Sequence, residues 1–127
     1  MRRIVVLVLA ALALQAGGIR WHGSFDRALE AAQAQQKPMF VVLVARGCTD
    51  CRRLFATTLR DERVVRRVQR EYVAVIVTKE NEDYPIELLY TLVYPTMFLL
   101  SPEEVLLKPP LSGLVDARLL EEKLFDE

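Results

Sequence analysis

Two unbroken apolar runs, residues 39–45 and 72–78, constrain the fold most strongly. Their sequences, MFVVLVA and YVAVIVT, show no regular alternation of polar and apolar positions. Such runs are typical of strands that are buried on both faces, in the middle of a sheet covered by helices. The segment between them places apolar residues at helical spacing among arginines. A strand, a helix and a second strand in this order favour a parallel pair with a right-handed crossover, and therefore an α/β fold.

The remaining segments complete a predicted order of α-β-α-β-α-β-β-α. Ser24 suits the N-cap of a first helix, and Pro38 ends that helix near residue 36. Pro85 suits the first position of a short helix. Because proline cannot donate to a β-ladder, Pro95 must lie at the start of a strand. The further elements predicted are a short helix over residues 85–92, two antiparallel strands over residues 96–100 and 105–107, and a last helix over residues 114–124.

The size and charge of the chain bound its function. With 127 residues, 52% of them hydrophobic, it suits a single domain with an ordinary core, and we expect a monomer. Its 17 basic residues balance its 17 acidic residues, so the charge implies no polyanionic partner. We therefore expect no nucleic-acid binding.

The first residues have the layout of a secretory signal peptide. Two arginines precede an apolar run over residues 4–14, and small residues follow at positions 16–18. The run is shorter than the roughly 20 residues that a membrane-spanning helix needs. We therefore divide the chain into a signal peptide, residues 1–18, and one domain, residues 19–127, and we expect export to the periplasm. Membrane contact would arise only through the first segment, if it stays uncleaved.

The two cysteines, Cys48 and Cys51, lie in the stretch RGCTDCRR directly after the first apolar run. Their spacing places both sulfurs on one face of a helix, with Cys48 at or just before its first turn. Unpaired backbone N–H groups point outward there and stabilise a thiolate. In an oxidising compartment the pair is a redox dithiol, part of a metal site or a structural disulfide.

The sequence resembles the thioredoxin-like superfamily, in particular its small exported members. The matching segments are KPMFVVLVARGCTDCRRL, a strand that runs into CxxC at a helix start, and VYPT, which opens the next hairpin. The resemblance covers roughly residues 21–124. It implies a three-layer α/β/α fold with a central mixed sheet of about four strands. It also implies that Pro95 is a cis-proline beside the cysteine pair and that the Tyr94 backbone pairs with an extended substrate peptide.

By this resemblance the protein is expected to be a thiol-disulfide oxidoreductase that acts on protein substrates. Cys48 would be the nucleophile that forms a mixed disulfide with the substrate, and Cys51 would resolve it. An unidentified redox partner would restore the starting state of the pair. We expect no bound organic cofactor and no metal.

Asp50 and Arg46 are expected to tune the reactivity of the pair. Related reductases commonly carry Trp-Cys-Gly-Pro-Cys, and here the negative charge of Asp50 between the cysteines disfavours the Cys48 thiolate. Arg46 and two neighbouring arginines oppose this effect. A less stable thiolate means a more reducing couple, so the reductase direction is mildly favoured. Two further departures are Gly47, which removes an aromatic wall, and Val42, where thioredoxins often bury an acid.

The alternative is a non-catalytic thioredoxin-like binding module. Such a module would use the two thiolates to handle copper or would keep them as a static bridge. A structural zinc site needs about four ligands, whereas the chain offers two cysteines and one histidine, His22. The arginines after the motif are either a solvated helix face or a docking patch for an acidic partner.

Overall fold

A computed structural model describes residues 17–127 of the chain. The predicted signal peptide, residues 1–18, therefore lies almost entirely outside the described residues. None of the helices within residues 17–127 is long and apolar enough to cross a membrane.

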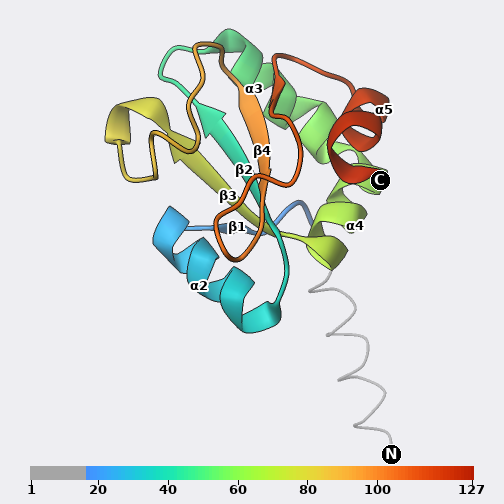
Figure 1. The fold of residues 1–127 in the computed structure, drawn as a ribbon. Helices are drawn as coiled ribbons and strands as arrows, with labels where there is room; N and C mark the ends of the chain where they lie inside the picture. Colours follow the sequence, from blue (N-terminus) through green and yellow to red (C-terminus); the bar gives the residue numbers. More distant parts are fainter. Residues whose placement is uncertain (1–16) are drawn as a thin grey trace, which may run out of the picture.

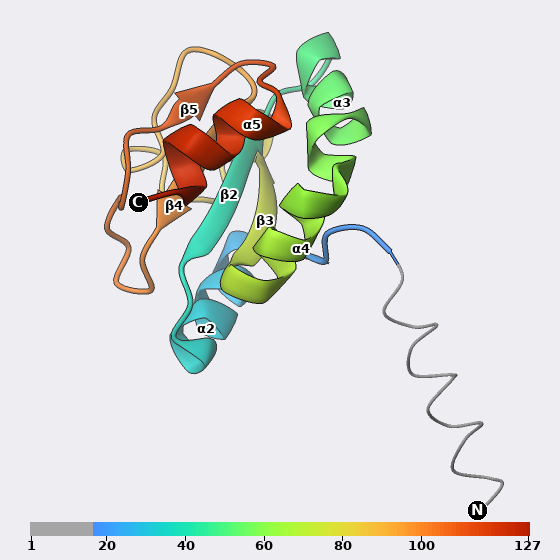
Figure 2. The ribbon, with the colours of Figure 1, turned by 90° about the vertical axis from the view of Figure 1, so that its right-hand side faces the viewer.

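A mixed sheet forms the centre of the domain, with its strands in the order β1-β3-β2-β4-β5 (Figures 1 and 2). The strands are β1 (Trp21–His22), β2 (Met39–Val44), β3 (Val73–Thr78), β4 (Thr96–Leu100) and β5 (Leu111–Ser112). β3 is parallel to both of its neighbours, β1 and β2. β4 is antiparallel to β2, and β5 is antiparallel to β4. The parallel pair expected from the two apolar runs is thus confirmed as β2 and β3.

Helices cover both faces of this sheet, which confirms the three-layer α/β/α prediction. They are α2 (Phe25–Gln35), α3 (Thr49–Ala56), α4 (Glu62–Glu71) and α5 (Ala117–Leu120), with short turns η1 (Thr58–Arg60), η2 (Lys79–Asn81) and η3 (Glu121–Phe125). α2 packs on one face, and residues of α3, α4 and α5 pack on the other. Figures 1 and 2 show this separation from two directions.

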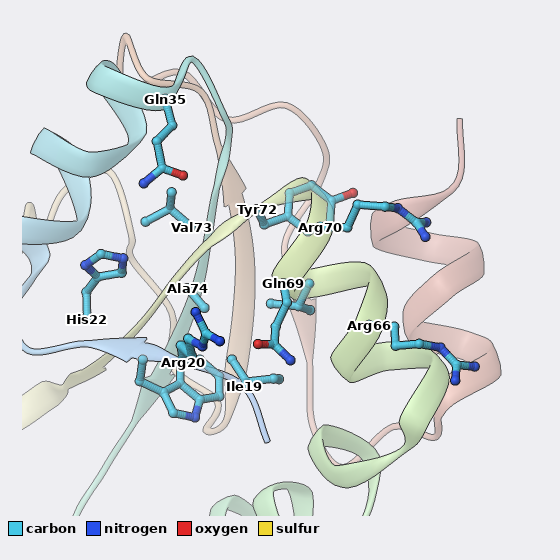
Figure 3. A pocket seen from close by; sticks show the side chains of 12 residues that line it. Ile19, Arg20, His22, Gln35, Arg66, Gln69, Arg70, Tyr72, Val73 and Ala74 are labelled. Carbon is cyan, nitrogen blue, oxygen red and sulfur yellow. The ribbon is translucent and has the colours of Figure 1, made fainter. Parts of the chain in front are cut away.

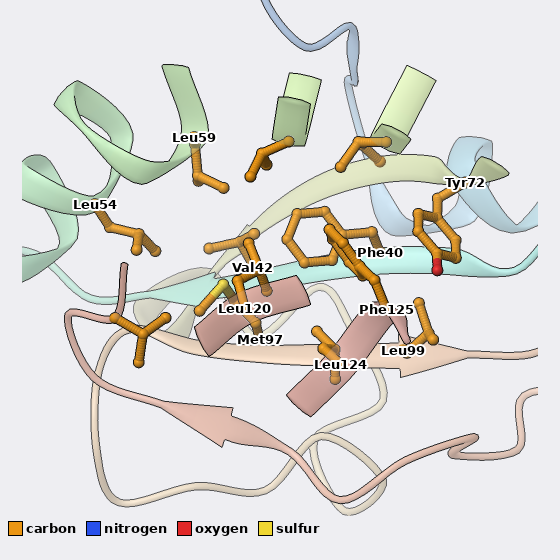
Figure 4. Packing of buried hydrophobic residues seen from close by; sticks show 14 residues of the cluster. Phe40, Val42, Leu54, Leu59, Tyr72, Met97, Leu99, Leu120, Leu124 and Phe125 are labelled. Atoms are coloured by element: carbon orange, nitrogen blue, oxygen red, sulfur yellow. The ribbon is translucent and has the colours of Figure 1, made fainter. Parts of the chain in front are cut away.

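Alternate residues of β2 enter two different hydrophobic clusters, which explains why its sequence is apolar throughout. Phe40 and Val42 pack against the α3, α4 and α5 side, and Figure 4 shows them among the buried side chains there. Met39, Val41 and Leu43 pack on the α2 side. All five are at most 1% exposed. Because successive side chains of a strand point to opposite faces, a strand covered on both sides needs an apolar residue at every position.

The helix predicted over residues 85–92 is wrong, because this segment forms a turn and irregular chain. One helical hydrogen bond is present, from Leu89 N to the Pro85 carbonyl at 3.0 Å. The hydroxyl of Thr91 accepts the backbone N–H of Val93 at 3.1 Å, a local bond that competes with helix formation. Of the three apolar positions expected to face the core, Leu89 is buried, but Ile86 and Leu92 are exposed.

The strand predicted over residues 105–107 is also wrong in its extent. A single antiparallel bridge joins Leu100 and Leu106, and the edge strand of the sheet is β5 instead. Pro109 and Pro110 stand between this bridge and β5, and neither has an N–H group to donate to β4. The strand β1 was not predicted, because its two residues are too short to show a periodic pattern.

The last helix begins later than predicted, at Ala117, where the carboxylate of Asp116 accepts the N–H of Leu119 at 2.8 Å. Leu114, expected on its apolar face, is exposed, whereas Leu120 and Leu124 are buried as expected. A π-helical turn, η3, follows and buries Phe125 as well.

Arg67 of α4 joins this C-terminal segment to the rest of the domain. Its guanidinium lies 2.5 Å from a carboxylate oxygen of Asp126 and donates to the Phe125 carbonyl at 2.9 Å. It also lies 5.6 Å from the centre of the Phe125 ring, within range of a cation–π contact. Its side chain is only 22% exposed, so solvent weakens these contacts less than those of a surface pair.

Replacing Arg67 with Met should destabilise the domain. The substitution keeps the volume of the side chain but removes its charge and its hydrogen bonds, and we expect the free energy of unfolding to fall by about 1–3 kcal/mol. Urea denaturation of the oxidised protein would measure this change. Arg66→Met is the matched control, because Arg66 is exposed and forms no salt bridge with any residue of the described chain. Equal losses for the two variants would contradict the role given to Arg67.

Candidate active site

Cys48 and Cys51 form a disulfide directly after β2, with their Cα atoms 5.2 Å apart. They are the two cysteines of the chain, and neither is free. Because β2 and β3 are parallel, the disulfide lies beyond the carboxyl ends of both strands. In open α/β sheets, functional sites lie preferentially outside these ends.

The start of α3 places the two sulfurs in different environments. Cys48 is the N-cap of the helix, and its Sγ accepts the backbone N–H of Cys51 at 3.0 Å. An N–H group of the first helical turn therefore already points at the Cys48 sulfur, where it would stabilise a thiolate after reduction. Cys48 is half-buried, whereas Cys51 is only 4% exposed. A sulfur that approaches from solvent therefore meets Cys48 first.

Gly47 has a backbone φ of +67°, in the left-handed region. A residue with a side chain is disfavoured in this conformation by roughly 1 kcal/mol or more, although no atom beyond its two chain neighbours lies within 4 Å of where its Cβ would be. From the resemblance alone, Gly47 is the loss of an aromatic wall. The structure adds that the backbone itself favours glycine at this turn.

The backbone N–H of Arg46 donates to Oε1 of Glu80 at 3.0 Å. Glu80 lies in η2, directly after β3, and is 34 residues away along the chain. This hydrogen bond lowers the pKa of the Glu80 carboxyl, so the group stays ionised at neutral pH. Glu80 thereby holds the chain two residues before Cys48 against the end of the neighbouring strand.

Sequence reasoning missed Glu80, although the sheet register contains the signal. Val44 of β2 pairs with Thr78 of β3. Arg46 and Glu80 each lie two residues further along, so parallel pairing brings them to the same edge of the sheet. The signal in the sequence is an acidic residue two positions after the end of the second predicted strand.

The segment around Pro95 lies beside β2 because β4 pairs with it, Thr96 opposite Leu43. The Tyr94–Pro95 peptide bond is cis, and the Pro95 carbonyl accepts the N–H of Gly113 at 2.7 Å. The buried hydroxyl of Thr96 donates to the Val93 carbonyl at 2.6 Å. Hydrogen bonds on both sides of Pro95 therefore fix the chain at the start of β4.

Tyr94 contacts the same short turn that holds Arg46. The ammonium nitrogen of Lys79 lies 5.6 Å from the centre of the Tyr94 ring, and the Tyr94 hydroxyl donates to the Thr91 carbonyl at 3.2 Å. The adjacent residues Lys79 and Glu80 thus contact the two chain segments that carry the predicted site residues. They join the loop before Cys48 to the segment before Pro95.

The two predicted tuning residues, Asp50 and Arg46, are both exposed. Asp50 lies in the first turn of α3, where the helix dipole favours an acidic side chain. Arg46 contributes its backbone N–H to the bond with Glu80, and its side chain forms no salt bridge with any residue from 17 to 127. Asp50 lies between the two cysteines in sequence. Its carboxylate likewise forms no salt bridge with any residue from 17 to 127.

The other candidate features lie away from the disulfide. In the part of the chain that the structure describes, no group of three or more His, Cys, Asp or Glu side chains is arranged to hold a metal ion. His22 lies in β1 and lines a cleft of about 800 Å³ together with Arg20, Gln35 and Gln69 (Figure 3). This cleft is bordered by Val73 at the amino end of β3, so it lies at the opposite end of the sheet from the cysteine pair.

Comparisons with known proteins agree on the fold. A family model described as thioredoxin-like matches residues 20–102. The solved structure of a putative disulphide-isomerase from Bacteroides thetaiotaomicron is 25% identical, has a TM-score of 0.71, and matches 89% of this chain and 98% of that protein. A thioredoxin from Thermus thermophilus is 22% identical, with a TM-score of 0.70 and coverage of 84% and 85%. An oxidoreductase named DsbH is 16% identical, with a TM-score of 0.70 and coverage of 86% and 84%. Comparison with curated proteins gave no match.

Removing the Glu80 carboxylate should release the Arg46 amide. In Glu80→Ala we expect rapid hydrogen exchange of this N–H and a shifted amide resonance, both measured by NMR. In the wild type, the lowered pKa of Glu80 means that the bond persists as pH falls to about 4.5, the ordinary value for the group, and weakens only as pH falls further.

Glu82→Ala is the matched control for this measurement, because Glu82 is an exposed acid two residues further along the same loop. Its removal should leave the Arg46 amide unchanged. An Arg46 amide with the same protection in wild type and Glu80→Ala would contradict the proposed contact.

Proposed function

Since the chain belongs to the thioredoxin-like family and carries its CxxC pair as a disulfide, we propose that it is a thiol-disulfide oxidoreductase acting on proteins. The observation that carries the proposal is the contrast between the two sulfurs. Cys48 is half-buried and receives an N–H group at the start of a helix, and Cys51 is buried one turn further on. This arrangement suits an attacking sulfur followed by a resolving sulfur.

In the reductase direction, the Cys48 thiolate attacks one sulfur of a substrate disulfide. A bond forms between Cys48 and the substrate, and the other substrate sulfur leaves as a thiolate that takes up a proton. The Cys51 thiolate then attacks the Cys48 sulfur, closes the internal disulfide and releases the second substrate sulfur as a thiol. Two electrons have then passed from the protein to the substrate. A partner protein with a dithiol restores the reduced pair.

The charges near the disulfide support the reductase direction. Asp50 lies in the first turn of α3, and the ionised Glu80 bonds to the chain two residues before Cys48. Both negative charges disfavour the Cys48 thiolate, which makes the reduced form less stable and the couple more reducing. The helix N-terminus and the exposed Arg46 act in the opposite sense.

Tyr94 and Pro95 are the proposed substrate-contacting residues, because their segment lies beside the end of β2 that leads to Cys48. An extended substrate segment would pair with the Tyr94 backbone as an added strand. The proposed setting is the periplasm, where the N-terminal signal sequence would direct the protein and where disulfides persist. The proposed active form is a monomer without a cofactor.

Cysteine substitutions test the function directly. In Cys51→Ser, Cys48 should form a mixed disulfide with a substrate that cannot be resolved, so trapped partners should appear on non-reducing gels. Cys48→Ser is the matched control and should trap none, because its remaining thiol is buried. The wild type should also catalyse the reduction of insulin.

Two outcomes would count against this function. Absence of both trapped partners and insulin reduction would overturn the oxidoreductase proposal. Stoichiometric retention of Cu(I) by the wild type, lost when either cysteine is changed, would instead favour a copper-binding module.

A further inference from the structure

The segment that leads into Pro95 exposes large apolar side chains. The exposed fractions are 42% for Ile86, 64% for Tyr90, 80% for Leu92 and 51% for Val93. We call these four residues the apolar ledge. They lie within eight consecutive residues, whereas most of the other large hydrophobic side chains of the described chain are buried. A cluster of this kind on a folded domain commonly marks an interaction surface.

Internal hydrogen bonds hold the apolar ledge in place. The Thr91 hydroxyl accepts the N–H of Val93 at 3.1 Å and lies 3.0 Å from the Thr96 hydroxyl. Leu89, between two ledge residues, is 1% exposed and anchors the segment in the core. The ledge is therefore arranged before any partner arrives, which reduces the entropy lost on binding.

The apolar ledge leads into the segment that lies beside the strand before the disulfide. Its last residue, Val93, is two residues from Pro95, and the adjoining turn η2 contacts both Tyr94 and the loop before Cys48. Figure 1 shows the segment before β4 rising beside the loop that joins β2 to α3. We therefore expect a polypeptide bound to Cys48 to extend toward the ledge.

The surroundings of the ledge are acidic. Residues 80–107 contain six acidic residues and no lysine or arginine. Three of the acids, Glu82, Asp83 and Glu87, are exposed and precede or interrupt the ledge. None of these three forms a salt bridge with another residue of the described part of the chain. Their charges are thus available to a partner.

We propose that the apolar ledge and these three carboxylates bind the segment of a substrate protein that adjoins its disulfide, and that they select segments carrying apolar and basic side chains. The inference rests on the proposed function and adds a substrate class to it. Apolar contact supplies affinity, and the unpaired carboxylates favour lysine or arginine over acidic residues. The arginines that follow Cys51 are exposed on α3, so the chain after the disulfide differs in charge from the acidic segment around the ledge.

Disulfide-linked peptide dimers provide the test. Three synthetic peptides would share one cysteine and one length: one with Leu and Phe before the cysteine and two Lys near them, one with the Lys replaced by Glu, and one with Leu and Phe replaced by Ser. The measured quantity is the second-order rate constant of their reduction by the reduced protein. At low salt the Lys peptide should react about 10-fold faster than the Glu peptide, and this ratio should shrink at high salt.

Variants of the protein test whether the apolar ledge and the three carboxylates cause these differences in reduction rate. The triple variant Glu82→Gln, Asp83→Asn, Glu87→Gln should remove most of the preference for Lys, and Leu92→Ser should slow the apolar peptides several-fold without slowing the Ser peptide. The matched control is Glu103→Gln with Glu104→Gln, which removes two exposed acids at the far end of β4. This control should keep the wild-type preference.

The outcomes separate this inference from the proposed function. Equal rates for the Lys and Glu peptides in the wild type would overturn the inference and leave the oxidoreductase activity standing. Failure to reduce any of the peptides would overturn both. A dimer in sedimentation experiments that Leu92→Ser disrupts would assign the ledge to a second copy of the chain and overturn the inference in another way.

Discussion

β2 is hydrogen-bonded to β3 on one side and to β4 on the other. These two ladders position the chain segments of the candidate site. Its parallel ladder with β3 runs from Met39 to Val44, and its antiparallel ladder with β4 covers Met39 to Leu43. The first ladder brings the loop before Cys48 beside the residues that follow β3, and the second brings the start of β4 to the same edge. Because each ladder fixes a register, the disulfide and Pro95 come to the same edge of the sheet without any direct bond between them.

The acidic residues expected to influence Cys48 follow β2 and β3 at the same edge of the sheet. In the proposed function, the helix that starts after Cys48 would stabilise negative charge on its sulfur, and the carboxylates of Asp50 and Glu80 would act against it. Glu80 also has a structural effect, because it bonds to Arg46 while the adjacent Lys79 contacts Tyr94. One turn therefore joins the two segments that carry the predicted site residues. The chain beyond this turn is acidic and apolar, and the chain beyond Cys51 is rich in arginine. The chain segments on the two sides of the candidate site therefore differ in charge.

Hydrophobic patterning was sufficient to predict the two central strands, their parallel order and the placement of Cys48 at a helix start. These features depend on local sequence and on burial, which the residues report directly. Glu80 was missed because its contact joins residues far apart in sequence and arises from strand register. The helix predicted over residues 85–92 does not form, because the hydrogen bond that the Thr91 hydroxyl accepts from the chain competes with it. Ile86 and Leu92, expected to face the core, are exposed. The edge strand was displaced because Pro109 and Pro110 interrupt the ladder.

The proposed function requires that Cys48 and Cys51 be a reversible redox couple and not a static bridge. The most direct measurement is the fraction of disulfide at equilibrium with glutathione or dithiothreitol buffers of graded potential, read by mass after thiol alkylation. We predict a reversible two-electron transition with a midpoint of about −250 to −270 mV, in the range of reductases. A midpoint near about −120 mV would contradict the reductase direction, and a disulfide that stays closed well below about −300 mV would contradict the redox role itself.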